Sequence, residues 1–151
     1  ILQSRVERQK ATPFPRESED LLAISAYITY QSRGLAMDAD IEGAARRNFD
    51  AGEAFFFRRR GQLNLNCAHC HDANWCRTLF AERISQGQPN AYPAYRLEWQ
   101  TLGSLERRLR ACLSGVRAEI LPYGSPEYAD VALYPSWRAK GLPIETPGVR
   151  R

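Results

Sequence analysis

The most constraining feature of this 151-residue sequence is the stretch Cys67-Ala68-His69-Cys70-His71. Two thiols three positions apart, followed directly by a histidine, form the C-x-x-C-H signature of covalent haem attachment. This spacing lets the two thiols reach the two vinyl groups of one porphyrin, while the imidazole turns back onto the iron. We therefore predict one haem c, attached through Cys67 and Cys70, with His71 as its first axial ligand.

Two other interpretations of the same stretch stay open. A zinc ion could bind Cys67, Cys70 and Cys76 together with one histidine, although zinc ligands usually come as two separated pairs. The two motif cysteines could instead form a redox dithiol. A haem is favoured because an aromatic segment with Phe55 and Phe56 precedes the motif by about ten residues, as in small c-type cytochromes.

The composition is that of one globular domain or slightly more. Hydrophobic residues make up 44% and charged residues 25% of the chain, and no apolar run is long enough to span a membrane. The net charge of +4 favours anionic small molecules or acidic partners. The basic residues are scattered and no nucleic-acid motif is present, so we expect neither nucleic acid nor a membrane as partner. Arg58–Arg60 should end a helix and face solvent.

The pattern of apolar residues and of helix stop signals predicts a mainly α-helical chain. The expected helices cover residues 18–33, 41–60, 103–114 and 125 to about 140. Ser18 and Ser104 should cap the first and third of them. Residues 75–100 contain several glycines and prolines and should be loops with short helical pieces. Pro135 should kink or break the last helix.

The first and last expected helices resemble each other without a gap at an offset of 107 residues. The aligned pairs include Ser18 with Ser125, Tyr27 with Tyr134, and Gly34 with Gly141. Such a repeat indicates a duplication. Residues 1–39 would then be the C-terminal tail of a preceding cytochrome c-like domain whose body is missing, and the chain a fragment or trimmed remainder. Residues 40–151 would form the haem-binding domain, a class I cytochrome c-like fold.

The second axial ligand must be found outside the motif, because the only other histidine, His69, lies between the attaching cysteines. The candidates are Met37, Cys76, Cys112 and a lysine, or the position could stay open. Cys112 is favoured, since Met37 precedes the motif and Cys76 follows it too closely, whereas Cys112 lies 45 residues beyond Cys67. A disulfide between Cys76 and Cys112 is the competing role for this thiol.

A thiolate ligand at Cys112 would lower the potential of the iron, which suggests sulfur chemistry more than simple electron storage. Arg108 precedes Cys112 by four residues and so lies on the same helix face. Its charge would favour the thiolate, and its guanidinium could hold a small oxyanion by paired hydrogen bonds. Arg107 and Arg110 should point elsewhere and meet solvent or haem propionates.

The segments GQLNLNCAHCHDANW, AYPAYRLEWQTLGS and RRLRAC resemble the SoxA family, the haem subunits of the periplasmic SoxAX cytochrome complexes of bacterial sulfur oxidation. The segments QSRVERQK, ESEDLLAISAYITYQSRGL and GLPIETPGVRR are similar to this family as well, so the resemblance covers nearly the whole chain. It implies a periplasmic L-cysteine S-thiosulfotransferase. Such an enzyme joins thiosulfate oxidatively to a cysteine of the SoxYZ carrier and passes electrons through haem to SoxX.

The resemblance also implies roles for individual residues. Cys67 and Cys70 would hold the haem, and His71 and Cys112 would ligate the iron. Cys112 would be the catalytic residue and a candidate bearer of a persulfide, and Arg108 would meet the substrate, which makes residues 40–151 the catalytic domain. The alternative function is a simple electron-transfer cytochrome c without thiosulfotransferase activity, in which Cys112 is a passive ligand or disulfide partner.

The chain departs from the family pattern at three places. The family usually has glycine where Cys76 stands, an apolar helix residue is expected at Pro135, and many members have a complete N-terminal cytochrome domain. These departures bear on stability and completeness more than on the site.

Overall fold

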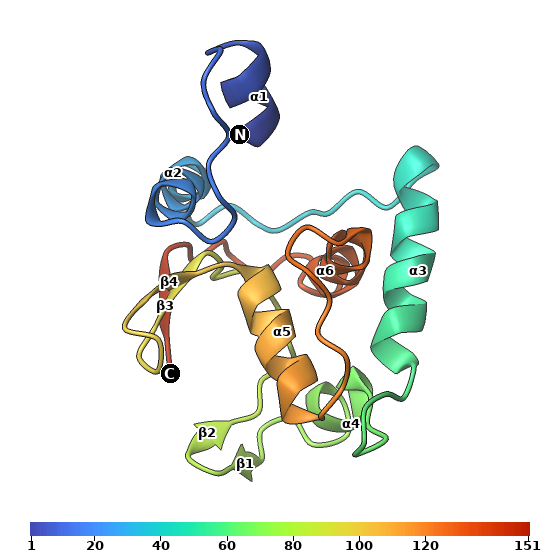
Figure 1. The fold of residues 1–151 in the computed structure, drawn as a ribbon. Coiled ribbons are helices and arrows are strands. Elements are labelled where there is room, and N and C mark those ends of the chain that lie inside the picture. The colour runs from blue at the N-terminus through green and yellow to red at the C-terminus, as the bar shows by residue number, and fades with distance from the viewer.

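Helices follow one another along the chain, and short strands are inserted between the fourth and fifth helices and at the C-terminus (Figure 1). The computed structural model describes residues 1–151. The helices are α1 (Leu2–Glu7), α2 (Glu19–Tyr30), the 3-10 turn η1 (Gly43–Ala45), α3 (Arg46–Phe57), α4 (Cys67–His71), α5 (Leu105–Gly115) and α6 (Pro126–Arg138). The strands are β1 (Thr78–Leu79), β2 (Glu82–Arg83), β3 (Ala94–Arg96), β4 (Thr101–Gly103) and β5 (Gly148–Arg150).

The core lies where α3 and α6 pack against each other. Phe49 and Phe56 of α3 are buried against Tyr134 of α6, with ring centroids 5.6 and 5.1 Å from that of the tyrosine. Aromatic rings in such tilted contacts bury a large apolar area and add a specific geometry. A glycine at position 52 permits the close approach, because a Cβ there would lie 2.0 Å from the carbonyl oxygen of Asp130. The same cluster contacts Cys67, so the core supports the motif helix α4 directly.

Two helix starts agree with the serine caps expected from the sequence. The Ser18 side chain accepts a hydrogen bond from the Leu21 N–H, and the Ser104 side chain accepts one from the Arg107 N–H. Each bond satisfies a backbone donor that the first helical turn leaves unpaired. The Ser104 cap fixes the start of α5, the helix that contains Cys112.

The helix expected over residues 41–60 is shorter than predicted. It consists of η1 and α3 and ends at Phe57, where the backbone of Arg58 turns extended. Arg58 and Arg59 are exposed, but Arg60 folds back. Its guanidinium lies 3.4 Å above the Phe55 ring and donates to the Phe55 carbonyl. The expectation that all three arginines face solvent is therefore wrong for Arg60, because a guanidinium can stack on an aromatic face.

Residues 75–100 contain strands where short helical pieces were expected. β1 pairs with β2 as an antiparallel hairpin, and β3 lies between β4 and β5 in a second sheet, antiparallel to β4 and parallel to β5. Strands of two or three residues are too short for a recognisable alternation of apolar side chains. The central strand also depends on β5, more than 50 residues further along the chain, which local sequence patterns do not reveal.

The last helix continues through Pro135 and ends at Arg138. Proline removes a single backbone donor. The turn around it is held by the Ala139 N–H, which donates to the Pro135 carbonyl, and by the Ser136 hydroxyl, which donates to the Ala132 carbonyl. Of the two outcomes expected for Pro135, a kink or a break, the break does not occur. No helix of the structure combines the length and apolarity needed to cross a bilayer.

The N-terminal part of the chain packs against the rest. The segments after α2 and α6 form an isolated antiparallel bridge between Ala36 and Pro143, two positions 107 residues apart. The four hydrogen bonds around it run from the N–H groups of Gly34, Met37, Gly141 and Ile144 to the carbonyls of Ile144, Leu142, Met37 and Leu35, in that order. These bonds are exchanged when each residue is shifted by 107, which is the two-fold pattern expected of a duplication. The domain boundary near residue 39 itself stays a prediction.

Candidate functional site

The motif forms its own short helix, α4, whose first turn is closed by a reciprocal cap. The Asn66 side chain accepts a hydrogen bond from the His69 N–H at 2.9 Å, and the Asn66 N–H donates to Nδ1 of His69 at 3.1 Å. Such a capping box satisfies two donors at once. His69 is thereby fixed at the helix start, where it serves the cap.

His71 is oriented by a backbone carbonyl. Its Nδ1 lies 2.7 Å from the Ser85 carbonyl oxygen, so Nδ1 is the protonated nitrogen and Nε2 presents its lone pair. Burial lowers the pKa of His71, while the bond to Ser85 acts in the opposite direction. A neutral imidazole with Nδ1–H bonded to a carbonyl is the usual arrangement of a metal-binding histidine.

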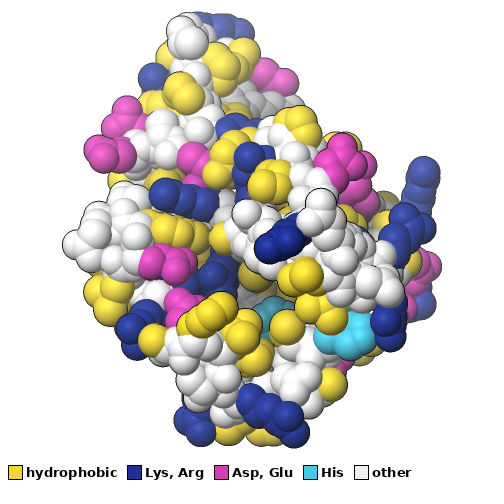
Figure 2. Space-filling model, turned by 60° about the horizontal axis from the view of Figure 1, so that its bottom comes forward, with side chains coloured by type: hydrophobic (Ala, Val, Ile, Leu, Met, Phe, Trp, Pro, Cys, Tyr) yellow, Lys and Arg dark blue, Asp and Glu magenta, His cyan; other side chains and the backbone are white.

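Gly87 leaves room for this imidazole. A Cβ at position 87 would lie 3.2 Å from Cγ and 3.3 Å from Nδ1 of His71. The loop that contains Ser85 and Gly87 therefore contacts the ring by both a hydrogen bond and close packing. In the lower face of the molecule (Figure 2), one of the two histidine side chains lies recessed among hydrophobic side chains.

Three thiols lie within electrostatic range of one another in this part of the molecule. Cys67, Cys70 and Cys112 are partly buried and free, and they are close enough for charge on one to affect another. Burial raises the pKa of Cys67 to about 11, and the nearby Arg60 opposes this. The structure thus brings Cys112, from α5, to the two motif cysteines of α4.

Burial also raises the pKa of Cys112, and Arg108 and then Arg96 act against the increase. Arg108 favours the thiolate, as expected from its position one turn before Cys112, but its charge does not outweigh desolvation. A coordinated metal cation would deprotonate such a thiol outright. Arg108 is therefore placed to act on Cys112 without being sufficient to ionise it.

Sequence reasoning missed the acidic and basic side chains around Arg108. Arg96 is almost completely buried, at 4% exposure, and forms ion pairs with Glu82 and Glu98. Both glutamates also pair with Arg108. We call these four residues the Arg–Glu ring. A charged residue in the apolar segment AYRLEW was a signal in the sequence, but nothing local linked it to Glu82 on the β1–β2 hairpin.

The neighbouring arginines of α5, expected to meet solvent or haem propionates, are half-buried and contact aromatic rings of the chain. Arg107 lies over the Trp99 ring at 4.4 Å. Arg110 donates to the Leu121 carbonyl and lies over the Tyr123 ring at 4.1 Å. Both side chains therefore hold loops onto the helix by stacking and hydrogen bonding.

The alternatives for the cysteines do not match the structure. No group of three or more His, Cys, Asp or Glu side chains is arranged to bind a metal ion, which contradicts a zinc site. Cys76 is exposed, and both Cys76 and Cys112 are free, so no disulfide joins them. Cys76 has φ of +70°, a backbone conformation that favours glycine. This explains why a glycine would suit that position better.

The residues fit a haem. Two thiols and an imidazole whose Nε2 has no partner within the chain lie on one short helix, a glycine is close to the imidazole, and a third thiol on a second helix lies within electrostatic range. Thiol and imidazole are the donors that haem attachment and haem iron require. The helical frame and this donor set define a cytochrome c-like domain.

The chain is 36% identical to the L-cysteine S-thiosulfotransferase subunit SoxA of Pseudaminobacter salicylatoxidans, over 148 residues that cover 97% of this chain and 52% of the relative. It is 34% identical to the subunit of the same name from Allochromatium vinosum, over 93% of this chain and 52% of the relative. Over nearly its whole length the chain is therefore similar to SoxA subunits. No family model matches it.

A solved structure has the same fold. The crystal structure of SoxXA from P. pantotrophus superimposes with a TM-score of 0.96 at 31% sequence identity, covering 99% of this chain and 57% of that chain. The resemblance inferred from the motif segments and the expected cytochrome c-like fold are thereby confirmed. The chain spans about half the length of the curated relatives it matches.

Proposed function

We propose that this chain is the catalytic part of a periplasmic L-cysteine S-thiosulfotransferase, with one covalently attached haem c in a class I cytochrome c-like domain. Cys67 and Cys70 would hold the porphyrin, and His71 and Cys112 would ligate its iron. The similarity to SoxA subunits supports the reaction class, and the SoxXA neighbour supports SoxX as the electron-accepting partner. The acceptor of the thiosulfate group would be a cysteine of SoxYZ.

The observation that carries the proposal is the position of Cys112. A generic electron-transfer cytochrome does not need a thiol next to its haem motif, and here the thiol is accompanied by an arginine on the same helix face. Arg108 would bind the sulfonate oxygens of thiosulfate by charge-assisted hydrogen bonds. Cys112 would meet the outer sulfur atom, and the partly buried site would limit access of water.

Joining thiosulfate to a thiol releases two electrons and one proton, and the bound haem would supply the route for the electrons. Arg108 would keep the bound anion in place, since its positive charge lies within the range that affects the Cys112 thiol. Burial would keep His71 neutral, and its bond to Ser85 would fix the orientation of the ring. These roles need no side chain outside α4, α5 and the loop after β2.

Replacing Cys112 with serine tests the proposal. We expect the haem-loaded full-length Cys112→Ser protein to keep one haem by mass, because both thioether cysteines remain. Thiosulfate transfer to SoxYZ, followed by the mass of the carrier, should fall by about a thousandfold or more, as when a catalytic nucleophile is removed. Cys112→Met is the matched control that retains a sulfur ligand without a thiol, and it should be equally inactive.

Full transfer activity in Cys112→Ser would contradict the catalytic role of this cysteine. If the unsubstituted protein is reduced and oxidised normally by SoxX but never modifies SoxYZ, the chain is an electron-transfer cytochrome and Cys112 a passive ligand.

A further inference from the structure

Arg96 is a buried cation that is held on all sides. Its side chain is 5% exposed. Nε lies 2.7 Å from Glu98 Oε1, Nη2 lies 3.2 Å from Glu82 Oε1, and the guanidinium lies 5.1 Å from the Trp99 ring. A buried guanidinium is tolerated only when its charge and donors are matched in this way. Arg96 also comes from β3, the central strand of its sheet, and is therefore a fixed point of the site.

Arg108 contacts the same two carboxylates much more loosely. Its Nη2 lies 3.6 Å from Glu82 Oε2 and its Nη1 lies 3.7 Å from Glu98 Oε1. Both distances are longer than a hydrogen bond, and the side chain is 30% exposed. Arg108 thus keeps donors available for a ligand, whereas Arg96 uses its donors on the glutamates.

We propose that Arg96 is a positioning residue that holds Glu82 and Glu98 away from Arg108, and so keeps the Arg108 guanidinium available for a small oxyanion. The inference rests on the proposed function, since thiosulfate is the oxyanion that this function requires. The two glutamates act as internal counter-ions, which Arg96 and Arg108 share unequally.

The charge balance of the Arg–Glu ring explains why Arg96 would keep Arg108 available. Two arginines and two glutamates sum to zero, so an anion can approach without net repulsion. Without Arg96 the ring would have a net charge of −1, and both carboxylates would turn to Arg108, the nearest remaining cation of the ring, with Arg151 as a further basic side chain on the same cavity. The carboxylates have room to turn, because Glu82 and Glu98 border a cavity of about 500 Å³.

Glu82 has the opposite effect in this scheme. It lies on the β1–β2 hairpin, and its Oε2 lies 3.6 Å from Arg108 Nη2, so its charge competes with a bound anion for the Arg108 guanidinium. Removal of the Glu82 charge would free Arg108 further and make the ring positive. If Arg96 and Glu82 had merely structural roles, replacing them would not change the oxyanion affinity in opposite directions.

The test measures the affinity of the haem-loaded full-length protein for sodium thiosulfate by titration calorimetry. Arg96→Gln should weaken binding roughly tenfold, and Glu82→Gln should strengthen it by about threefold. The double variant R96Q/E82Q restores a neutral ring and should bind within about twofold of the unsubstituted protein. Arg96→Lys, which preserves the charge, should recover most of the affinity lost in Arg96→Gln.

Arg47→Gln is the control for net charge. Arg47 is an exposed arginine of α3, and its substitution should leave the thiosulfate affinity unchanged. The Soret band of each variant shows whether the haem site is intact. Equal affinities of Arg96→Gln and the unsubstituted protein, or weaker binding by Glu82→Gln, would overturn the inference. The thiosulfate affinity of Glu82→Gln still tests the inference if Arg96→Gln does not fold.

Transfer to SoxYZ is measured on the same samples and separates the two proposals. Thiosulfate binding without transfer by the unsubstituted protein would refute the proposed function, while the affinities would still decide the role of Arg96. Failure of the unsubstituted protein to bind thiosulfate overturns the inference directly.

Discussion

At the scale of single residues, Gly87 controls the orientation of His71. A methyl group at position 87 would meet the imidazole at 3.2 to 3.3 Å, so we expect Gly87→Ala to displace the ring and weaken its bond to Ser85. The visible spectrum of the haem-loaded protein should then show a partial loss of axial histidine ligation.

Gly141→Ala is the matched control for this substitution. Gly87 and Gly141 both have positive φ, +79° and +85°, and an alanine costs about 1 kcal/mol of stability at either position. A Cβ at Gly141 has no neighbour within 4 Å. The visible spectrum of Gly141→Ala should therefore equal that of the unsubstituted protein. Identical spectra for both variants would show that Gly87 has no part in orienting His71.

The candidate site was predictable from the sequence only in its chemically distinctive residues. Cys67, Cys70 and His71 follow from their spacing, and Cys112 follows from the shortage of other ligands. Ser85 acts through its backbone carbonyl, and any residue type could provide that contact. Arg96 depends on partners from other elements, so its role required the tertiary structure.

At the scale of elements, the crossing of α3 and α6 depends on Gly52. A Cβ at this position would lie 2.0 Å from the Asp130 carbonyl oxygen and 3.3 Å from the Val131 Cα. Gly52→Ala must therefore separate the two helices that hold the core, and we expect a loss of about 3 kcal/mol or more in unfolding free energy. Denaturant unfolding followed by circular dichroism measures this loss.

Gly115 in the last turn of α5 provides the comparison. A Cβ at Gly115 has no neighbour within 4 Å, and alanine has the higher helix propensity, so Gly115→Ala should be neutral or stabilising by up to about 1 kcal/mol. Equal destabilisation by both substitutions would contradict a contact-specific role of Gly52.

Helices with a cap and an apolar face, such as α2 and α5, were predicted close to their observed bounds because the signals that specify them are local. The strands were not predicted. β3 obtains its partners from β4 nearby and from β5 at the C-terminus, and the latter pairing is invisible in any short window of sequence.

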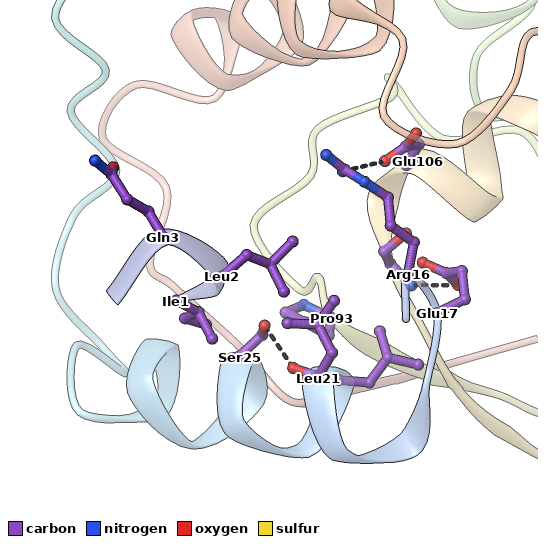
Figure 3. Close-up of a pocket in the computed structure, with 11 residues that line it drawn as sticks. Ile1, Leu2, Gln3, Arg16, Glu17, Leu21, Ser25, Pro93 and Glu106 are labelled. Carbon is purple, nitrogen blue, oxygen red and sulfur yellow. Dashed lines mark hydrogen bonds and ion pairs between the residues drawn. The ribbon is translucent and has the colours of Figure 1, made fainter. Parts of the chain in front are cut away.

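At the scale of the whole molecule, the N-terminal segment is integrated into the rest of the fold. Leu22 and Ala26 of α2 are buried, and Arg33 Nη1 donates to the Glu145 carbonyl at 2.7 Å. Figure 3 shows a second connection, where Arg16 reaches Glu106 of α5 at 3.5 Å. Residues 1–39 therefore pack on the same body as the haem motif, whatever domain they derive from.

Two truncations test this integration. Deletion of residues 1–38 removes α2 and the bridge to Pro143, and buried apolar area on both sides becomes exposed. We expect a loss of roughly 3 kcal/mol, from one leucine, one alanine and the surface they cover. Thermal unfolding of the haem-loaded protein, followed at the Soret band, should show a lower midpoint.

Deletion of residues 1–8 provides the contrast, because α1 has no buried residue, and the midpoint should hardly change. An unchanged midpoint after deletion of residues 1–38 would mean that the N-terminal segment is a passive extension. A lowered midpoint would mean that residues 39–151 need the N-terminal segment for stability. The reciprocal hydrogen bonds between residues 34–37 and 141–144 favour the second outcome, since each of the two segments satisfies backbone groups of the other.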